Sequence, residues 1–258
     1  MAMRTVHNAA STRASILVIQ PDEQVPLGRF ADWLTQYGAE VTVIQPFAGD
    51  DVPSELHTDG LIVLGGAMSA HCLEQFPWLA DIKALYQRAA EAHAPALGIC
   101  LGAQLLTLAF DGEVTSNAPV GPEIGVVDIA WTPDSADDAI TKGLPESFRA
   151  TSFHYDGISA LPKGAVLLGR GDRYEHQVFR IGHAVGVQFH PEATPELFRS
   201  WCAADVIQKP ELAEFFEQSM QLVERNDDEI AMHAATLARN FVAALQAAPR
   251  MQRHEALP

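Results

Sequence analysis

The sequence is poor in three features on which large classes of protein depend: cysteine, basic residues and long apolar runs. Of its 258 residues only three are cysteines, Cys72, Cys100 and Cys202, which is too few for a disulfide framework. Lys and Arg number 17 against 33 Asp and Glu, and the net charge of −16 repels phosphate backbones and anionic membrane surfaces alike. These shortages disfavour disulfide scaffolds and proteins that bind nucleic acid or membranes.

Long apolar runs are also missing, since no stretch approaches the roughly 20 uninterrupted apolar residues of a membrane span. The first 14 residues carry Arg4 and Arg13 but lack the apolar run of a signal peptide. Apolar residues nevertheless make up 48% of the chain, enough for a sizeable core. We therefore expect a globular, cytoplasmic protein.

In the first 110 residues, short apolar runs alternate with segments of helical periodicity. We expect strands at residues 15–19, 40–44, 60–64 and 95–99, and helices at residues 27–37, 78–92 and 101–110. Strands and helices that alternate at these spacings form right-handed crossovers and a mostly parallel, doubly wound sheet. The pattern predicts an α/β fold.

The middle of the chain contains short β-like segments at residues 114–131, 149–152, 165–168, 177–181 and 184–189, which predict an antiparallel section. Beyond residue 210, apolar residues at helical spacing predict an amphipathic helix, with Ile230, Ala234, Leu237, Phe241 and Leu245 on one face. We expect three regions: a loosely ordered N-terminus (1–14), one α/β domain (15–205) and a helical C-terminal extension (206–258).

The segment Gly98–Gln104 predicts a tight turn from a strand into a helix, with Cys100 at its apex. Glycines two residues to either side of Cys100 suit a turn that leaves little room for side chains, as in a nucleophile elbow. The start of a helix favours a thiolate and offers unpaired backbone amides. Two readings are open from this segment alone: a nucleophilic thiol or a small buried apolar residue.

A second segment ends a strand with His190, Pro191 and Glu192. Pro191 restricts His190 to an extended conformation, so the side chains of His190 and Glu192 can lie on the same side of the chain. Glu192 can then orient the imidazole towards a nucleophile from elsewhere. The alternatives are a structural histidine at the strand end, or a metal site, which is disfavoured because no further ligands lie at suitable spacing.

Together, the Gly98–Gln104 elbow, the segment Phe189–Glu192 and the glycines after residue 64 resemble the class I glutamine amidotransferases. The resemblance covers residues 15–200 and is closest to stand-alone members similar to the glutaminase domain of GMP synthase. It implies a flavodoxin-like fold in which Cys100 is the nucleophile, His190 the general base and acid, and Glu192 its orienting partner. No cofactor or metal is expected.

The resemblance also implies an oxyanion hole made by the backbone amides of Gly66 and Leu101, in a loop that begins at Gly65. Ala67 stands where the family frequently has proline. Two preset donors of this kind stabilise the negative charge that develops on a carbonyl oxygen during acyl transfer. An ordinary turn after a strand is the alternative for the two glycines.

Gly65 and several further residues are candidates for contacts with a γ-glutamyl substrate. Gln104 lies four residues after Cys100, on the same face of the expected helix. Glu123 is a candidate partner for an α-amino group, although a charge in a Gly/Pro loop is usually solvated. By the resemblance, the glutamine pocket is lined by the segment Ser152–Asp156, and we expect Ser152, Phe153 and His154 to contact the substrate.

The sequence is compatible with three alternative functions. We expect thiol-dependent hydrolysis of a γ-glutamyl amide bond, in glutamine or another γ-glutamyl compound, through a thioester on Cys100. The first alternative is a glutaminase subunit that delivers ammonia to a separate synthetase, because the chain shows no ATP-binding module of its own. The second is a non-catalytic binding or regulatory protein on the same fold, because a fold does not fix a function. The sequence gives no oligomeric state.

Overall fold

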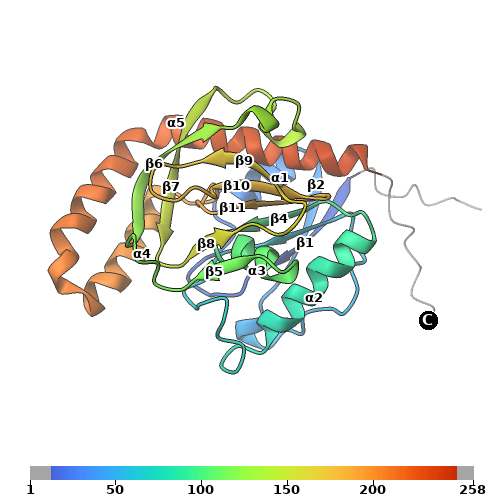
Figure 1. Ribbon diagram of the computed structural model, residues 1–258, viewed down its shortest axis with the longest axis horizontal. Coiled ribbons are helices and arrows are strands. Elements are labelled where there is room, and N and C mark those ends of the chain that lie inside the picture. The colour runs from blue at the N-terminus through green and yellow to red at the C-terminus, as the bar shows by residue number, and fades with distance from the viewer. Residues whose placement is uncertain (1–12, 249–258) are drawn as a thin grey trace, which may run out of the picture.

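The computed structural model describes residues 13–248, and in these residues the strands form one nine-stranded sheet and a separate two-stranded sheet (Figure 1). The order of the large sheet is β2-β1-β3-β4-β11-β10-β9-β6-β7. Its first five strands are parallel and the rest pair antiparallel. The predicted doubly wound sheet with an antiparallel section is confirmed.

The parallel half has the flavodoxin-like strand order, in which successive crossovers reverse direction beside the first strand. Ligands bind such sheets in the crevice at the carboxyl ends of the strands, near the point of reversal. The bounds of these strands are β1 (Ala14–Ile19), β2 (Ala39–Ile44), β3 (Gly60–Val63), β4 (Ala96–Ile99) and β11 (Ala184–Val187).

The antiparallel half differs from the sequence prediction at two places. The expected segment at residues 114–131 is two strands, because a turn with positive φ at Asn117 and Gly121 divides it. A strand at residues 157–160, which was not predicted, pairs with the first of them. The bounds are β5 (Glu113–Thr115), β6 (Glu123–Trp131), β7 (Ser147–His154), β8 (Gly157–Ala160), β9 (Val166–Arg170) and β10 (Val178–Ile181).

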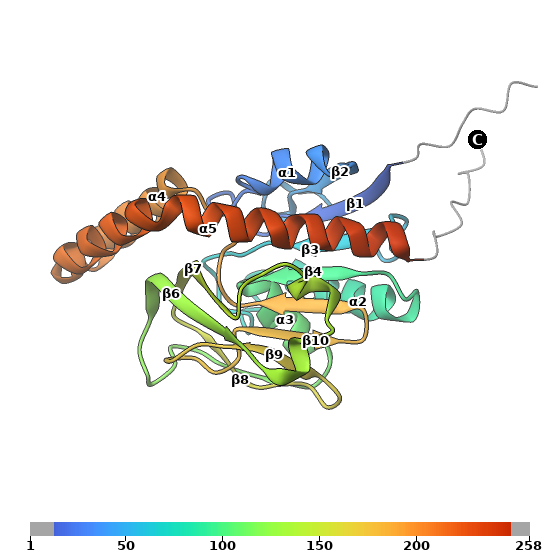
Figure 2. The same cartoon turned by 90° about the horizontal axis from the view of Figure 1, so that it is seen from above.

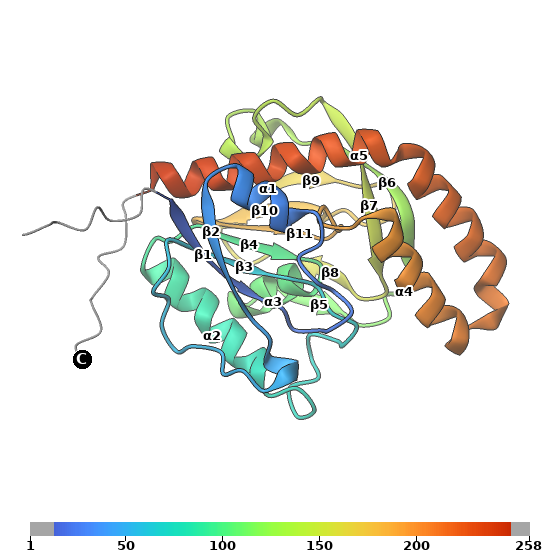
Figure 3. The ribbon, with the colours of Figure 1, turned by 180° about the vertical axis from the view of Figure 1, so that it is seen from behind.

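Helices cover both faces of the large sheet. The helices α2 (Trp78–Glu91) and α3 (Leu101–Ala109) pack on one face in one apolar cluster. On the other face lie α1 (Phe30–Gln36) and much of α5 (Ala213–Ala247), in front of the strands in the view from behind, and α4 (Pro195–Gln208) packs against α5 at one end of the sheet (Figure 3). Short 3-10 turns occur at Pro46–Ala48, Pro133–Ser135, Ala139–Thr141 and Pro210–Leu212.

The helix α1 starts three residues later than its periodicity predicts. Gly28 has φ of +52°, and a Cβ there would lie 2.2 Å from the carbonyl oxygen of Glu192. The next amide, of Arg29, donates to that same oxygen over 3.0 Å. The chain therefore passes too close to the Glu192 backbone to be helical before residue 30.

The C-terminal helix α5 is part of the main core. Leu237, Phe241 and Leu245 are at most 3% exposed and share an apolar cluster with strands of the parallel sheet. Figure 2 shows α5 running along the length of the molecule, with α4 folded back at its far end. The expected boundary between residues 205 and 206 falls inside α4, which Thr194 caps and Pro210 follows.

The two ends of the chain lie partly outside the described residues. Residues 1–12 and 249–258 of the expected terminal segments are not described, and Ala14 already belongs to β1. No helix within residues 13–248 has both the length and the apolar composition that crossing a membrane requires.

Candidate active site

Cys100 occupies a strained turn between β4 and α3. Its φ of +50° lies in the left-handed region, which costs energy for any residue with a side chain and is typical of functional positions. The Cys100 amide donates to the carbonyl of Val187 over 2.8 Å, and the Cys100 carbonyl accepts from the Gln104 amide over 3.0 Å. These bonds tie the turn to β11 on one side and to the first turn of α3 on the other.

The glycines that flank Cys100 are required by close backbone approaches. A Cβ at Gly102 would lie 2.1 Å from the carbonyl oxygen of Val63. A Cβ at Gly98 would lie 2.6 Å from the carbonyl oxygen of Gly102 and 2.7 Å from the hydroxyl of Tyr86. The expected tight turn from strand to helix is therefore present, and α3 packs directly against the end of β3.

His190 and Glu192 follow β11 and form a buried pair. His190 Nδ1 and Glu192 Oε1 are 2.7 Å apart, and both side chains are at most 3% exposed. Burial by itself disfavours a charged imidazole. The charge of Glu192, the charge of Cys100 and their hydrogen bonds to the ring outweigh it and raise the pKa of His190 above its ordinary value.

The imidazole of His190 is fixed from two further directions. The indole ring of Trp201, on α4, lies with its centroid 4.7 Å from that of His190. A Cβ at Gly65 would lie 2.8 Å from Cε1 of His190 and 3.6 Å from Cβ of Cys100. Only glycine therefore fits at position 65 without moving the ring.

The loop after β3 and the start of α3 bring two backbone amides to the same edge of the sheet. Within residues 13–248, neither the Gly66 amide nor the Leu101 amide donates to another group of the protein. The next amide in the loop, of Ala67, donates to a carboxylate oxygen of Asp22 over 2.9 Å. Two unpaired donors near a thiol are the arrangement that binds a developing oxyanion.

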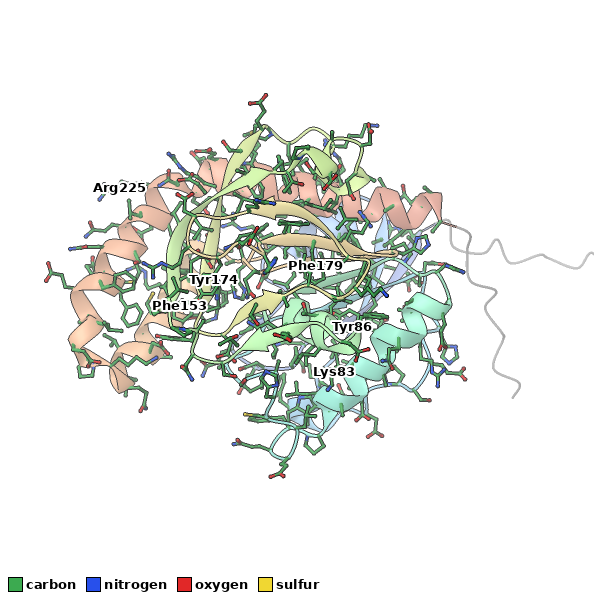
Figure 4. The ribbon with its side chains drawn as sticks, in the orientation of Figure 1. Lys83, Tyr86, Phe153, Tyr174, Phe179 and Arg225 are labelled. Atoms are coloured by element: carbon green, nitrogen blue, oxygen red, sulfur yellow. The ribbon has the colours of Figure 1, made fainter. Side chains whose placement is uncertain are left out.

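A cavity of about 320 Å³ opens at this edge of the sheet. It lies between the loops after β1 and β3, the turn at Cys100, the end of β7 and one face of α4. Six of the predicted site residues line it, namely Gly66, Cys100, Gln104, Phe153, His154 and His190. Figure 4 shows Phe153 and Tyr174 to the left of Lys83 and Tyr86, which lie on α2.

The remaining predicted site residues do not line the cavity. Glu192, Gly65 and Leu101 lie directly behind residues that do, at the positions described above. Ser152 is fully buried and faces Glu123. Glu123 is 6% exposed and accepts from Gln177 Nε2 over 2.7 Å.

Glu123 therefore lies behind His154 and outside the lining of this cavity, and its expected contact with an α-amino group stays a prediction. Its carboxylate lies 3.1 Å from Nε2 of His154, and the other ring nitrogen of His154 lies 2.9 Å from the carbonyl oxygen of Asp156. The same carbonyl accepts from the side-chain amide of Gln104 over 3.0 Å. These contacts fix His154 and Gln104 in the cavity wall.

Sequence reasoning missed Asp22 and Trp201, and it included Asp156 only as the last residue of the segment expected to line the pocket; all three line the cavity. One carboxylate oxygen of Asp156 accepts from the Asn117 amide over 2.8 Å, and the other, Oδ2, is buried with no partner within residues 13–248. The available signal for Asp156 was its place directly before Gly157, where a short acidic side chain can bond the backbone of a turn.

Cys72 and Cys202 take no part in this arrangement. Cys72 is half-buried, and Cys202 is 2% exposed in an apolar cluster with Phe198 and Phe216, as expected for a packing residue. Burial raises the pKa of the Cys202 thiol to about 12. No group of three or more His, Cys, Asp or Glu in residues 13–248 is arranged to hold a metal ion.

Comparisons with known proteins identify the family of this chain. The sequence model of the family "Glutamine amidotransferase class-I" matches residues 29–208. "Gamma-glutamyl peptidase 5" of Arabidopsis thaliana is 29% identical over 54% of this chain, and the match spans 55% of that protein. One subunit of the glutamine-hydrolyzing GMP synthase of Methanocaldococcus jannaschii is 29% identical over 59% of this chain and 77% of that one.

A solved structure shows the same fold. A glutamine amidotransferase from Thermotoga maritima superposes with a TM-score of 0.77, at 26% identity, over 89% of this chain and 98% of that one. The family match covers well over half of the sequence and includes the Cys100 turn and the His190–Glu192 pair. The chain belongs to the class-I glutamine amidotransferase family.

Proposed function

We propose that this protein hydrolyses a γ-glutamyl amide bond through a thioester on Cys100. The observation that carries the proposal is the pair Cys100 and His190 in the wall of one cavity, with Glu192 behind them and its carboxylate 2.7 Å from the imidazole. A buried base oriented by a carboxylate beside a thiol is the arrangement that activates a nucleophile.

The proposed reaction has two steps. The Cys100 thiolate attacks the γ-carbonyl carbon, and the oxyanion is bound by the amides of Gly66 and Leu101. The C–N bond then breaks, His190 gives its proton to the leaving amine, and the glutamyl thioester remains. Water attacks the thioester while His190 takes its proton, the C–S bond breaks, and glutamate leaves with the thiolate restored.

Asp156 is the group best suited to hold the α-ammonium of the glutamyl half. Its Oδ2 is buried without a protein partner among the described residues, and Asp156 lines the same cavity as Cys100. A buried carboxylate oxygen without a donor is costly, and an ammonium group of the substrate would supply that donor. Gln104 and His154 then shape the pocket, since Nε2 of Gln104 and both ring nitrogens of His154 are already engaged in the wall.

A second candidate is a glutaminase subunit that passes ammonia to a synthetase. The similarity to one subunit of a glutamine-hydrolyzing GMP synthase favours it. The similarity to "Gamma-glutamyl peptidase 5" favours an enzyme that acts alone on a γ-glutamyl compound. The two proposals share Cys100 chemistry and differ in what accepts or leaves with the amine.

The test is release of glutamate by the purified chain from glutamine and from a panel of γ-glutamyl dipeptides. We expect kcat/KM of about 10⁴ M⁻¹s⁻¹ for at least one of them, the low end of ordinary enzymes. Cys100→Ala is the blank, and Cys72→Ala is the matched cysteine control, which keeps full activity.

The outcomes separate the candidates. Fast turnover of a dipeptide by the isolated chain supports the hydrolase. Slow turnover on every substrate that a synthetase-containing cell fraction accelerates supports the ammonia-donating subunit. Absence of turnover under both conditions, with Cys100 unreactive towards alkylating agents, refutes catalysis by this site and leaves a binding protein.

A further inference from the structure

The loop from Gln20 to Val25, which follows β1, lies between the Gly65–Ala67 loop and α4. We propose that Asp22 in this loop is a positioning residue that holds the oxyanion-binding amide of Gly66 in place. The inference rests on the proposed function for its catalytic consequence, but the contact itself is independent of any substrate.

Asp22 bonds two backbone amides at once. Its Oδ2 accepts from the Ala67 amide over 2.9 Å, and its Oδ1 accepts from the Gln24 amide over 2.9 Å. The first bond joins segments 45 residues apart in the sequence, and the second fixes the carboxylate itself. The Ala67 amide lies in the peptide unit directly after Cα of Gly66, so the bond to Asp22 fixes that unit and leaves the Gly66 amide, on the other side of the same Cα, fewer ways to rotate.

The Gly65–Ala67 loop needs such a restraint because its glycines provide none. Glycine samples more backbone conformations than any other residue, and a donor that rotates freely stabilises an oxyanion poorly. Packing limits the space around Gly66 on one side, since a Cβ there would lie 3.4 Å from Cβ of Asp22 and 2.8 Å from a methyl of Leu101. The bond from Asp22 supplies the directional restraint that packing alone does not.

The other end of the Gln20–Val25 loop contacts Trp201, whose ring packs on His190. The carbonyl of Gln24 accepts from Nε1 of Trp201 over 2.7 Å, and the Trp201 ring lies against His190. Val25 reaches Gly65, where a Cβ would lie 3.1 Å from a Val25 methyl. The loop therefore connects the oxyanion-binding loop to the ring that packs on His190.

Because Asp22 is negatively charged, a positioning role and a mere lining role predict opposite changes in kcat when it is removed. A carboxylate beside a site where negative charge develops disfavours that charge, so an Asp22 that merely lined the cavity would slow the reaction. Removing it would then raise kcat. A positioning role predicts the opposite sign, because losing the bond misplaces the Gly66 amide.

The experiment compares Asp22→Asn and Asp22→Ala with Asp59→Ala in the full chain. Asp59 is the matched control because its carboxylate accepts from the Ser15 amide over 2.8 Å and joins segments 44 residues apart, at the opposite end of β1. We expect both Asp22 variants to lose roughly 10-fold to 100-fold in kcat, as misplaced catalytic groups do. We expect Asp59→Ala to keep its kcat.

Two further measurements separate positioning from general damage. Alkylation of Cys100 by iodoacetamide forms no oxyanion, so its rate stays within about twofold of the unmodified protein in both Asp22 variants. Amide hydrogen exchange of residues 64–69 becomes faster in the Asp22 variants and not in Asp59→Ala.

Raised kcat in Asp22→Ala, or unchanged exchange of residues 64–69, overturns the proposal. Equal losses of kcat and of Cys100 alkylation also overturn it, because the damage is then general. If the unmodified protein hydrolyses no γ-glutamyl compound, the proposed function fails, while the exchange measurement still decides whether Asp22 holds the loop.

Discussion

Replacing Gly65 by alanine tests how tightly the proposed catalytic pair, His190 and Glu192, is held. The new methyl group would lie 2.8 Å from Cε1 of His190 and 3.1 Å from a methyl of Val25. An ordinary van der Waals contact begins at 3.4 Å, so the imidazole has to move by about 0.6 Å. Trp201 and the hydrogen bond to Glu192 oppose movement of the imidazole in other directions.

The expected magnitude follows from that displacement. Overpacking of a buried site by one methyl group costs about 1–3 kcal/mol of folding free energy. We expect kcat to suffer more than folding stability, because displacements on the order of 1 Å at a reacting group lower rates by about 100-fold. We therefore expect kcat of Gly65→Ala to fall by about 30-fold to 100-fold, with a modest loss of stability.

The assay is glutamate release at saturating substrate, together with urea denaturation. Gly169→Ala is the matched control: its methyl group would lie 3.0 Å and 3.1 Å from side-chain atoms of Val178 and Ile129, away from the cavity. We expect the control to lose stability and keep kcat. A Gly65→Ala protein with unchanged kcat would refute the view that the His190 ring has no room to move.

Four further outcomes are expected. A glutamine-like electrophile should label Cys100 before Cys72 or Cys202, as read by mass mapping, and first labelling of Cys72 would contradict the proposed nucleophile. In Glu192→Gln, loss of the carboxylate charge lowers the pKa of the buried His190, so the imidazolium is lost at lower pH than in the unmodified protein. Cys100 alkylation should then slow near neutral pH and change little in alkaline buffer; an unchanged pH profile would remove Glu192 from the mechanism. Phe241→Ala, at a site 2% exposed in the core, should cost about 3–5 kcal/mol by urea denaturation, whereas Phe215→Ala, 40% exposed, should cost little. Trp201→Ala should lower kcat more than Trp78→Ala, because Trp78 packs against Phe76 and lines no part of the cavity.

Local patterns predicted most of the parallel half of the fold. The apolar runs before Gly65 and Cys100 are strands because burial on both faces of a parallel sheet demands continuous apolar residues. The turn at Cys100 was predictable because its glycines meet a steric requirement that acts within a few residues. The strand β8 was missed because its four residues carry no clear alternation, and its pairing with β5 depends on residues more than 40 positions away.

The candidate site was predictable only in part. Cys100, His190 and Glu192 stand in short segments with recognisable spacing, so the sequence alone was enough to predict them as the reactive set. Contacts between distant segments are different in kind, because they depend on how loops at the sheet edge meet. Asp22 reaching Ala67 has no signature in either segment.

The sequence by itself therefore determined the alternation of strands and helices, the elbow at Cys100 and the adjacent His190 and Glu192. Only the tertiary structure decided that Glu123 lies behind His154, that a buried oxygen of Asp156 is left unpaired among the described residues, and that α5 belongs to the core. The physical reason is the distance along the chain over which each kind of interaction acts. Backbone conformation and apolar periodicity act over a few residues, whereas burial and the partner of each polar atom are fixed only when segments far apart in the chain are packed together.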